Sequence, residues 1–216
     1  MHLKRQEVPK RWPVYRKGTK YVVRPDMNLE SGVPLIIILR DMLKIVRNRK
    51  EARGAIFMKH ILVNSRVPKD EKNPVLLFDT ISLLPLQKNY RLDLSEGGKF
   101  ILSEISAEDA NKKPVKVVNK KVLRGKKVQI NLQDGNNFLS DIKCNTNDSV
   151  LIDFKKKKIE KCLPLKESSR AMVFAGKHSG KRGEIKKIDS QKKIVELETH
   201  GKEKINVLLK QIMVIE

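Results

Sequence analysis

Cysteine, aromatic residues and long apolar runs are all scarce in this sequence. Two cysteines, Cys144 and Cys162, are too few for a disulfide framework and form no Cys-x-x-Cys pair, so we expect two reduced thiols. No apolar run approaches the roughly 18 residues that span a bilayer. The N-terminus lacks an apolar signal core, so we expect neither a membrane span nor secretion. Aromatic residues make up 5% and apolar residues 39% of the 216 positions, which predicts small cores.

Acidic residues are scarce as well. The sequence has 25 of them against 47 lysines and arginines, and the formal net charge is +22 at pH 7. Such a charge opposes compaction of the isolated chain and favours a polyanionic partner. Nucleic acid is the first candidate for that partner, and an anionic membrane surface is the second. The pattern divides the chain into segments 1–34, 35–88, 89–167 and 168–216, each with a surplus of five or six positive charges. This even distribution favours a chain spread along RNA over one that joins a binding module to a catalytic module.

Segment 1–34 mixes basic residues with rings and has no clear period. Pro9, Pro13 and Pro25 discourage long regular structure, so we predict an extended basic arm that is poorly ordered without RNA. Its cations would meet phosphates and its rings would stack on bases. The alternative is a solvated basic tail. The candidate RNA-binding residues of this segment are His2, Lys4, Arg5, Lys10, Arg11, Trp12, Tyr15 and Arg16.

Segment 35–88 has the clearest helical signal. Apolar residues recur at helical spacing over 35–46, and a second short helix is predicted over 49–58. Residues 61–67 predict a strand, a tight turn at Asn64-Ser65 and a strand, and 75–84 predicts a further strand pair. We therefore expect two helices against a small sheet, with rows of cations on the helix faces. The candidate RNA-binding residues are Arg40, Lys44 and Arg47 in one row, Arg49 and Arg53 in a second, and Lys59 and Arg66 beyond them.

Segments 89–167 and 168–216 alternate apolar and polar residues between turn residues, which is typical of strands. Strand candidates in the first are 90–94, 100–102, 115–118, 128–132 and 150–154. Ser106 and Asp109 resemble a capping box, and the cations 155–158 are either a solvated hairpin tip or a phosphate contact. Five short strands in the second, which suit a small SH3-like barrel, are 171–174, 183–188, 194–198, 204–207 and 213–215. The expected fold class is α+β, mostly β.

The glycine-rich stretch 176–183 invites comparison with a nucleotide-binding loop. A P-loop needs Gly-x-x-x-x-Gly-Lys followed by Ser or Thr, but here the spacer is one residue short and the last position is Arg182. The following pattern predicts a strand, so no helix N-terminus is available for phosphates. We therefore predict a β-turn that holds cations against an RNA backbone. Its candidate RNA-binding residues are Lys177, His178, Lys181 and Arg182.

Catalytic and metal-binding constellations are absent from the sequence. The four histidines, His2, His60, His178 and His200, lie far apart without metal-ligand spacing. There is no Gly-x-Ser-x-Gly elbow, and acidic pairs such as Glu108-Asp109 fall in polar turns. We therefore expect no enzyme, no metal ion and no cofactor.

Three local patterns occur in order and together resemble one family. The opening His2-Leu3-Lys4-Arg5, with Pro9 and Trp12 after it, resembles the N-terminal signature of the archaeal and eukaryotic small-subunit ribosomal protein family S-four-e. Residues 34–40 and 61–67 through 79–81 resemble the S-four-type RNA-binding domain of that family, and 175–185 resembles a KOW motif in an SH3-like barrel. The resemblance covers essentially the whole chain.

The sequence departs from the family pattern in a few places. Gln6 and Glu7 stand where an apolar residue and a small or amide residue are usual, and Asn64-Ser65 replaces the common Asn-Gly turn. The sequence stops at Glu216, without the basic extension typical of eukaryotic members, which favours an archaeal-type member.

The resemblance implies a structural constituent of the small ribosomal subunit that binds and stabilises ribosomal RNA and supports translation. It implies contacts with neighbouring subunit proteins, no membrane partner, no homo-oligomer and a cytoplasmic location in the ribosome. The implied domains are an N-terminal arm (1–34), an S-four-type domain (35–88), a central β domain (89–167) and a KOW/SH3-like barrel (168–216). Two alternatives stay open. One is an RNA-modifying enzyme with an S-four-type domain, and the other is a transcription-associated KOW protein.

Overall fold

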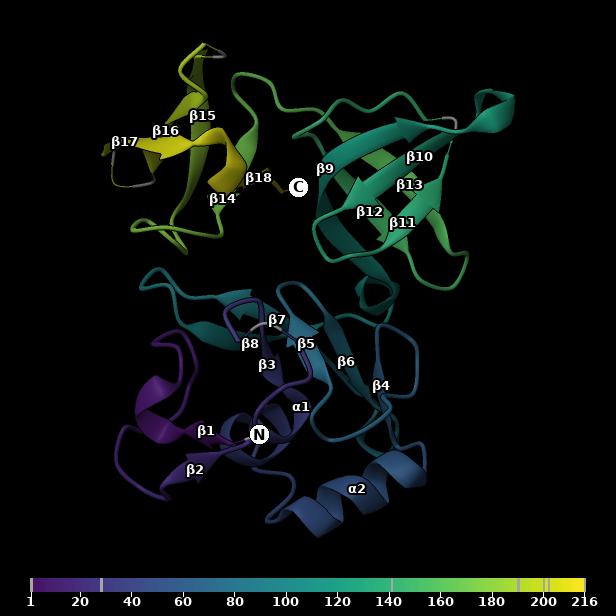
Figure 1. Ribbon diagram of the computed structural model, residues 1–216, viewed down its shortest axis with the longest axis vertical. Helices are drawn as coiled ribbons and strands as arrows, with labels where there is room; N and C mark the ends of the chain where they lie inside the picture. The colour runs from purple at the N-terminus through teal and green to yellow at the C-terminus, as the bar shows by residue number, and fades with distance from the viewer. Residues whose placement is uncertain are drawn as a thin grey trace. The chain divides into compact units, whose positions relative to one another are not determined.

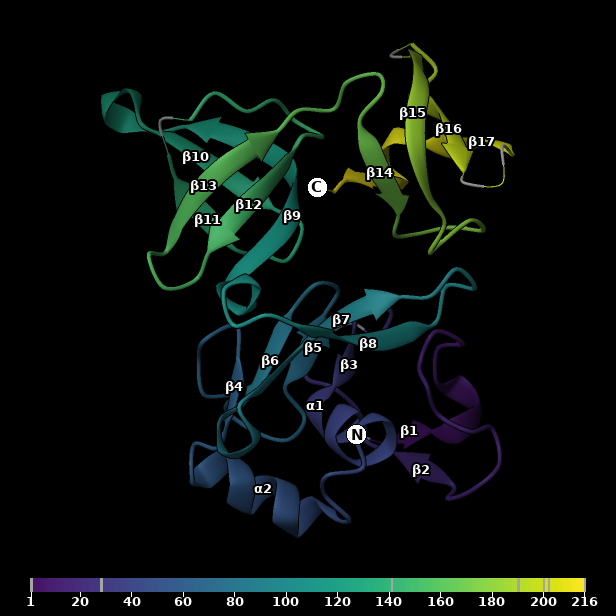
Figure 2. The same ribbon diagram turned by 180° about the vertical axis from the view of Figure 1, so that it is seen from behind.

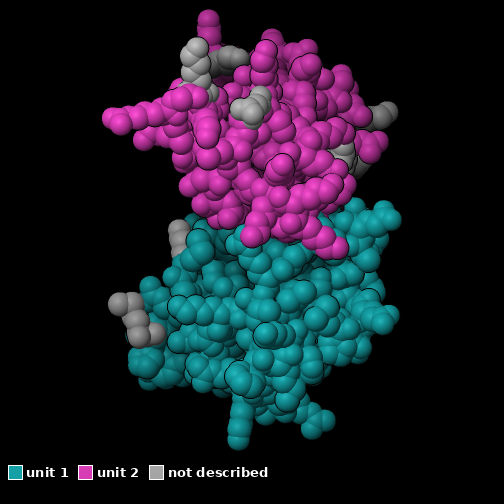
Figure 3. All heavy atoms as spheres, turned by 90° about the vertical axis from the view of Figure 1, so that its right-hand side faces the viewer, with its two compact units in different colours: residues 1–93, 99–111 teal, residues 94–98, 112–216 magenta. Residues whose placement is uncertain are grey.

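The computed structural model describes residues 2–27, 29–140, 142–189, 191–199, 201 and 203–215, so His200 lies outside the described residues. The chain forms two compact units, Met1–Asp93 with Lys99–Asn111 and Leu94–Gly98 with Lys112–Glu216 (Figure 3). Strands dominate, and the α-helices of the described residues lie in the first unit (Figures 1 and 2). The expectation of a mostly β chain is confirmed.

The N-terminal residues fold into a small two-stranded sheet. Strand β1 (Leu3–Lys4) pairs antiparallel with β2 (Tyr21–Val22), and the chain between them turns back on itself (Figure 1). Leu3 and Trp12 are each 3% exposed. Burial of two large apolar side chains stabilises this segment on the first unit. The prediction of an extended, poorly ordered arm is therefore wrong.

The first helix is short, and its first five residues are fully buried. It consists of α1 (Leu35–Ile37) continued by a π-helical turn, η2 (Ile38–Met42). The five residues 35–39 are all 0% exposed, so apolar packing surrounds the helix instead of covering one face of it. The prediction of a helix here is confirmed, but the helix ends before the predicted end at residue 46.

Because this helix ends early, the cations predicted as the first row do not lie on one helix. Lys44 has a φ of 55° and Arg47 lies beyond the helix in the loop before the next one. Arg40 is within the π-helical turn. Because the three residues do not share a helix, the prediction that Arg40, Lys44 and Arg47 form one row on a helix face is wrong.

The second helix, α2 (Arg49–Phe57), confirms the prediction over 49–58. Asn48 caps it, since its Oδ1 accepts a hydrogen bond of 3.0 Å from the backbone N–H of Glu51. Ala52 and Ile56, one turn apart, are buried against the unit. The helix therefore has one buried stripe and one solvated face, which carries Arg49 and Arg53.

Two sheets complete the first unit. Strand β3 (Gly32–Pro34) pairs with β5 (Pro74–Leu76), so β5 does not pair with the next strand along the chain as predicted. The larger sheet has the order β4-β6-β7-β8. Its strands are β4 (Ile61–Val63), β6 (Thr80–Leu83), β7 (Lys88–Leu94) and β8 (Phe100–Ile105). The expected boundary at residue 88 therefore falls within this sheet.

The tight turn after β4 confirms the sequence prediction. Asn64 and Ser65 have φ values of 51° and 61°, as a two-residue turn of this kind requires. The strand predicted after the turn is reduced to a single bridge between Val63 and Arg66. The Asn64 Nδ2 donates to Asp79 Oδ1 at 2.8 Å, and its Oδ1 accepts from the Thr80 N–H at 3.0 Å. These bonds attach the turn to β6.

The first sheet of the second unit has the order β11-β10-β9-β12-β13, and its strands are antiparallel. Their bounds are β9 (Lys112–Val122), β10 (Val128–Leu132), β11 (Asn137–Leu139), β12 (Ser149–Asp153) and β13 (Lys158–Leu163). Strands β9, β10 and β12 were predicted, whereas β11 and β13 were not. The cation run after β12 forms the turn that leads into β13.

Both cysteines belong to this sheet region and are free thiols, as expected. Cys144 is 1% exposed. Burial first of all, and the neighbouring Cys144 and Asp148 next, raise the pKa of Cys162 to about 12. A thiol with such a pKa stays protonated and unreactive at neutral pH.

The C-terminal sheet has the antiparallel order β17-β16-β15-β14-β18. Its strands are β14 (Arg170–Val173), β15 (Arg182–Asp189), β16 (Ile194–Thr199), β17 (Lys204–Leu208) and β18 (Ile212–Val214). All five predicted strands are therefore confirmed. Inward-facing residues such as Ile185, Val195 and Leu197 are 0% exposed and form its core. The assignment as an SH3-like barrel stays a prediction.

A buried lysine joins the two sheets of the second unit. Lys116, on β9, is 3% exposed, and its Nζ donates to the carbonyl of Leu209 and, at 2.7 Å, to that of Ile212. The same Nζ lies 5.9 Å from the centre of the Phe174 ring. Nearby, the buried Val214 N–H donates to Ser149 Oγ at 3.0 Å. These contacts fix the last strand of the chain against the preceding sheet.

Candidate nucleic-acid interface

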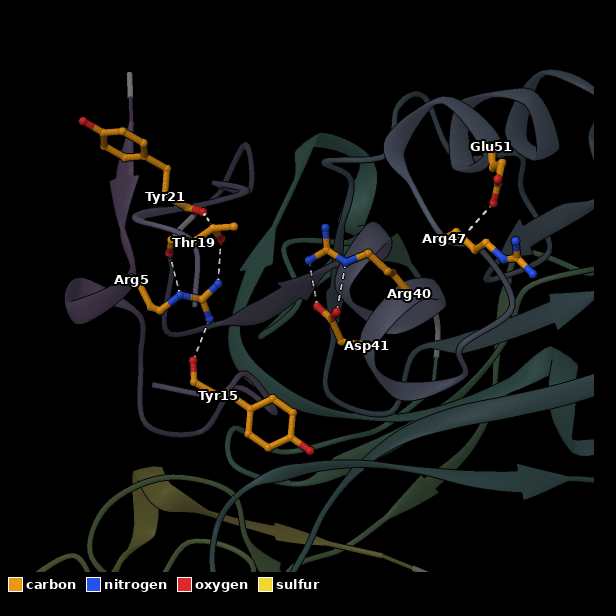
Figure 4. A network of polar contacts seen from close by, with 8 residues as sticks. All are labelled: Arg5, Tyr15, Thr19, Tyr21, Arg40, Asp41, Arg47 and Glu51. Carbon is orange, nitrogen blue, oxygen red and sulfur yellow. Dashed lines mark hydrogen bonds and ion pairs between the residues drawn. The ribbon is translucent and has the colours of Figure 1, made fainter. Parts of the chain in front are cut away.

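Arg5 holds the N-terminal loop in one shape. Its Nε and Nη1 donate to the carbonyls of Thr19 and Tyr15, both at 2.6 Å, and its Nη2 donates to Thr19 Oγ1 at 2.7 Å (Figure 4). Gly18 has a φ of 139°, and a Cβ there would lie 3.1 Å from the Arg5 guanidinium. The guanidinium therefore contacts the chain's own loop, so the structure gives Arg5 a positioning role where the sequence predicts an RNA contact.

The loop that Arg5 fixes presents a ring among cations. Tyr15 is 89% exposed, and Arg16, Lys17 and Lys20 are exposed beside it. His2 and Lys4, on the adjoining strand, are exposed too, as is Lys10. The His2 and Tyr21 rings lie with centroids 5.1 Å apart, and Lys20 Nζ is 5.5 Å from the Tyr21 ring. The sequence reasoning did not name Lys17, Lys20 or Tyr21 as contacts, although their types and positions fit the same pattern.

Trp12 is not part of this surface. It is 3% exposed, and its indole Nε1 donates to the carbonyl of Leu29 at 3.2 Å. The carbonyl of Arg11 accepts from the backbone N–H of Phe100 at 2.9 Å, which attaches the same stretch to β8. A ring buried in the protein is unavailable for stacking, so the prediction that Trp12 stacks on a base is wrong.

The residues predicted as the first helix row have separate surroundings. Arg40 donates through two nitrogens to the two carboxylate oxygens of Asp41, each at 2.9 Å (Figure 4). The hydrogen bond to Asp41 also raises the pKa of Arg40 above its ordinary value. Lys44 and Arg47 are exposed, and the backbone N–H of Arg47 donates to Glu51 Oε2 at 2.7 Å. Arg40 is thus partly neutralised, whereas the other two side chains face solvent.

Arg49 and Arg53 do lie on one face of α2, and they share a buried carboxylate. The side chain of Glu71 is 0% exposed, while those of Arg49 and Arg53 are 52% and 59% exposed. Arg49 Nε pairs with one oxygen of Glu71, and Arg53 Nε pairs with the other at 3.0 Å. Both bonds use Nε, so each guanidinium binds Glu71 with one edge and directs much of its surface to solvent.

Lys59 and Arg66 are exposed at the far end of α2 and in the turn after β4. Lys59 has a φ of 58° and follows the helix directly. Its backbone N–H donates to the carbonyl of Ile56 at 2.9 Å, which ends the helix. These two cations and the α2 pair lie in the first unit.

The loop between β14 and β15 carries the four candidates of the second unit. Lys177 and Arg182 are exposed and His178 is half-buried. Lys181 Nζ pairs with Glu203 at 2.9 Å, and this hydrogen bond lowers the pKa of Glu203. The loop leads into strand β15, as predicted, which supports rejection of the P-loop comparison.

Glycine is required at position 180 of this loop. Gly180 has a φ of 93°, and a Cβ there would collide with the carbonyl oxygen of Ser95. Its N–H donates to the Val173 carbonyl at 2.7 Å. The loop backbone therefore packs against Ser95 and is hydrogen-bonded to Val173, which fixes the backbone positions from which its cations extend.

The candidate residues described above offer charge and an exposed ring for stacking. Among the described residues, no group of three His, Cys, Asp or Glu side chains is arranged to hold a metal ion. No helix in the described part of the chain is long and apolar enough to cross a membrane. The site is best described as two sets of exposed cations on fixed loops and on a helix, one set in each unit.

The role of Arg5 gives a first prediction. Arg5→Ala should loosen the loop 15–20, because three bonds from one guanidinium are lost. We expect trypsin to cleave after Arg16 and Lys17 about tenfold faster, the factor that corresponds to about 1.4 kcal/mol. Arg5→Lys should not restore protection, since an ammonium cannot reproduce the planar fork. Lys4→Ala, at an exposed neighbour, is the control, and equal cleavage in Arg5→Ala and Lys4→Ala would contradict the role.

Comparison with known proteins identifies the family. Residues 86–159 match the model of "Ribosomal family S4e", and residues 1–27 match that of the "RS4NT (NUC023) domain". The chain is 39% identical over 190 residues to small ribosomal subunit protein eS4 of Methanocella arvoryzae, which covers 87% of this chain and 80% of that protein. It is 37% identical over 191 residues to eS4 of Methanothermobacter thermautotrophicus, with coverage of 87% and 79%. Both relatives are archaeal, as expected for an archaeal-type member.

A solved structure shares the fold. The crystal structure of 30S ribosomal protein S4e from Thermoplasma acidophilum superposes with a TM-score of 0.72 at 24% identity. The match covers 86% of this chain and 95% of that one. Sequence identity over most of the chain, the two family matches and the shared fold agree. The chain therefore belongs to ribosomal family S4e, a family of structural small-subunit ribosomal proteins and not of enzymes.

Proposed function

We propose that this chain is a structural constituent of the small ribosomal subunit that binds ribosomal RNA through cations of both units. The observation that carries the proposal is the N-terminal loop fixed by Arg5, which presents Tyr15 at 89% exposure among exposed cations. RNA-binding proteins use this combination, with cations on phosphates and an exposed ring on an unstacked base.

The contact residues we propose are those the structure leaves exposed. In the first unit they are His2, Lys4, Lys10, Tyr15, Arg16, Lys44, Arg47, Arg49, Arg53, Lys59 and Arg66. In the second unit they are Lys177 and Arg182, with His178 and Lys181 beside them. Arg5 positions a loop, while Arg11 and Arg40 are half-buried and make smaller contributions. The even charge surplus along the sequence supports this distributed interface.

Several finer assignments belong to the same proposal. The C-terminal sheet is an SH3-like barrel whose β14–β15 loop is the KOW motif, supported by the five strands and the glycines at 176 and 180. The first unit contains the S-four-type domain, supported by α2 and the turn at Asn64-Ser65. Neighbouring subunit proteins are further partners, and the ribosome of the cytoplasm is the location.

Binding specificity tests the proposal. At moderate salt, the purified chain should bind folded small-subunit ribosomal RNA more tightly than a random RNA of equal length. The major groove of A-form RNA is too narrow for side chains to read the bases, so the protein recognises its RNA by shape. Equal affinity for both RNAs would overturn the proposal. Sedimentation with small subunits, and not with RNA polymerase, separates it from a transcription-associated role.

Salt dependence provides a further prediction. With about 10 phosphate contacts, the slope of log affinity against log salt concentration should be about −7 to −9. Lys177→Ala, which removes one exposed cation, should make the slope less steep by about 1 and weaken binding to every RNA alike. Glu184→Gln, an exposed change on the neighbouring strand β15, is the control. A slope near zero would contradict an electrostatic interface.

A further inference from the structure

Helix α2 ends in two large apolar side chains that face solvent. Phe57 is 87% exposed and Met58 is 66% exposed, whereas Ile56 is 7% exposed and packs into the unit. Phe57 lies one position beyond the buried stripe of the helix, so its ring adds little to the core. A ring of this size on a rigid element is suited to binding.

Cations share a helix face with this ring. Lys50, Arg53 and Phe57 are spaced by three and four residues, so they follow one another along one side of α2. Lys50 is exposed, and the side chain of Arg53 is 59% exposed although its Nε pairs with Glu71. Positive charge therefore lies one and two helical turns before the ring, on its own face.

Gly54 leaves an open strip of backbone beside the ring. Glycine is unfavourable in a helix interior because it exposes the backbone and loses most entropy on folding. A Cβ at Gly54 would meet no atom within 4 Å, so packing within the chain does not require glycine here. The position lies one turn before Phe57, where the missing side chain gives a planar group room to lie against the helix.

The end of the helix is held firmly. The backbone N–H groups of Met58 and Lys59 donate to the carbonyls of Gly54 and Ile56, both at 2.9 Å. The carbonyl of His60 accepts from the Leu84 N–H at 2.9 Å, which attaches the segment to the chain after β6. A ligand that meets this ring does not have to order the backbone first.

We propose that the face of α2 formed by Lys50, Arg53, Gly54 and Phe57 is a stacking site for an unpaired base of ribosomal RNA. The base lies on the Phe57 ring over Gly54, and the two cations contact the adjacent phosphates. Charge favours RNA over an apolar protein segment, since exposed Lys59 adds further positive charge at the helix end. The inference rests on the proposed function and adds a contact that sequence patterns did not indicate.

Four variants of the full chain test the site by equilibrium binding to folded small-subunit RNA over a range of salt. Phe57→Ala and Phe57→Leu should weaken binding about 5- to 150-fold, the range for one stacked base. Phe57→Tyr should bind like the wild type. Gly54→Gln should raise the Tm, because glutamine is a better helix former, and yet weaken binding by filling the strip. The salt slope should not change in the Phe57 variants, since no phosphate contact is lost.

Val67→Ala, at another exposed apolar residue of the first unit (44% exposed), is the matched control and should bind like the wild type. Wild-type affinity in Phe57→Ala would overturn the stacking site. Wild-type affinity in Phe57→Leu would overturn it as well, because an apolar contact without a ring would then suffice. If the wild-type chain itself fails to distinguish ribosomal from random RNA, the proposed function fails. If the wild type discriminates and every Phe57 variant does so equally well, only the stacking site fails.

Discussion

Replacing Arg49 and Arg53 together by alanine should lower the unfolding free energy of the first unit by about 3–5 kcal/mol, because a buried carboxylate would lose both of its cations. Glu71 is fully buried, and both of its oxygens bond to these two arginines. The second carboxylate near Arg53, Asp70 at 3.7 Å, would then add repulsion. Denaturant unfolding followed by hydrogen exchange at α2 and β5 measures the loss unit by unit, since a chain of two units is not a two-state system.

The triple variant with Glu71→Leu should recover most of this loss, since apolar packing often replaces a buried ion pair without cost. Lys50→Ala, at an exposed position on the same helix, should change stability by less than about 0.5 kcal/mol. Wild-type stability in the double arginine variant would show that the two arginines serve RNA alone. The stability measurement also decides how RNA binding by the double variant is interpreted. A loss of RNA affinity indicates lost phosphate contacts only if the fold of the variant is intact.

Lys116→Met should lower the unfolding free energy of the second unit by about 1–3 kcal/mol at pH 7. The change leaves the carbonyls of Leu209 and Ile212 without their donor, and relief of a buried charge offsets only part of that cost. Hydrogen exchange should accelerate first in β18, which Lys116 and Ser149 attach to the preceding sheet. Lys120→Met, on the same strand and more exposed, is the control.

The stability of the second unit should also depend on pH through this residue. Burial lowers the pKa of Lys116 from 10.5 to about 8. Between these two values the unfolded chain binds more protons than the folded chain, so the unfolding free energy rises with pH across that window, by about 3 kcal/mol in all. The neutral amine still donates to both carbonyls. The difference between the wild type and Lys116→Met should therefore grow from pH 8 to 10.5, and a flat difference would contradict the burial of a charged lysine.

Local patterns predicted the elements that local physics determines. The turn at Asn64-Ser65 was predicted because its backbone needs residues that tolerate positive φ, and α2 was predicted with Arg49 and Arg53 one turn apart. Of the five C-terminal strands, β15, β16 and β17 place buried residues at alternating positions. The exposed cations on the N-terminal and β14–β15 loops followed from composition alone.

The errors have a common cause, which is contact between residues distant in the sequence. A Trp among cations is equally consistent with an RNA contact and with a small core, and only the fold places Trp12 against the Leu29 carbonyl. Arg49 and Glu71 are 22 positions apart, so no helical period indicates their pairing. The apolar residues at 35, 38 and 39 fit an amphipathic period in the sequence, but all of residues 35–39 are buried, so this part of the helix leaves no exposed face for cations. Strands β11 and β13 were not predicted, and they join the sheet through pairing with neighbours.

Nucleotide-resolution crosslinking of the chain within the assembled small subunit tests the central claim, a ribosomal RNA interface spread over both units. We expect RNA crosslinks from the loop around Tyr15, from α2 at Phe57 and from the β14–β15 loop at Lys177, and no crosslink from Trp12. Crosslinks confined to one unit, or reaching only neighbouring proteins, would contradict it.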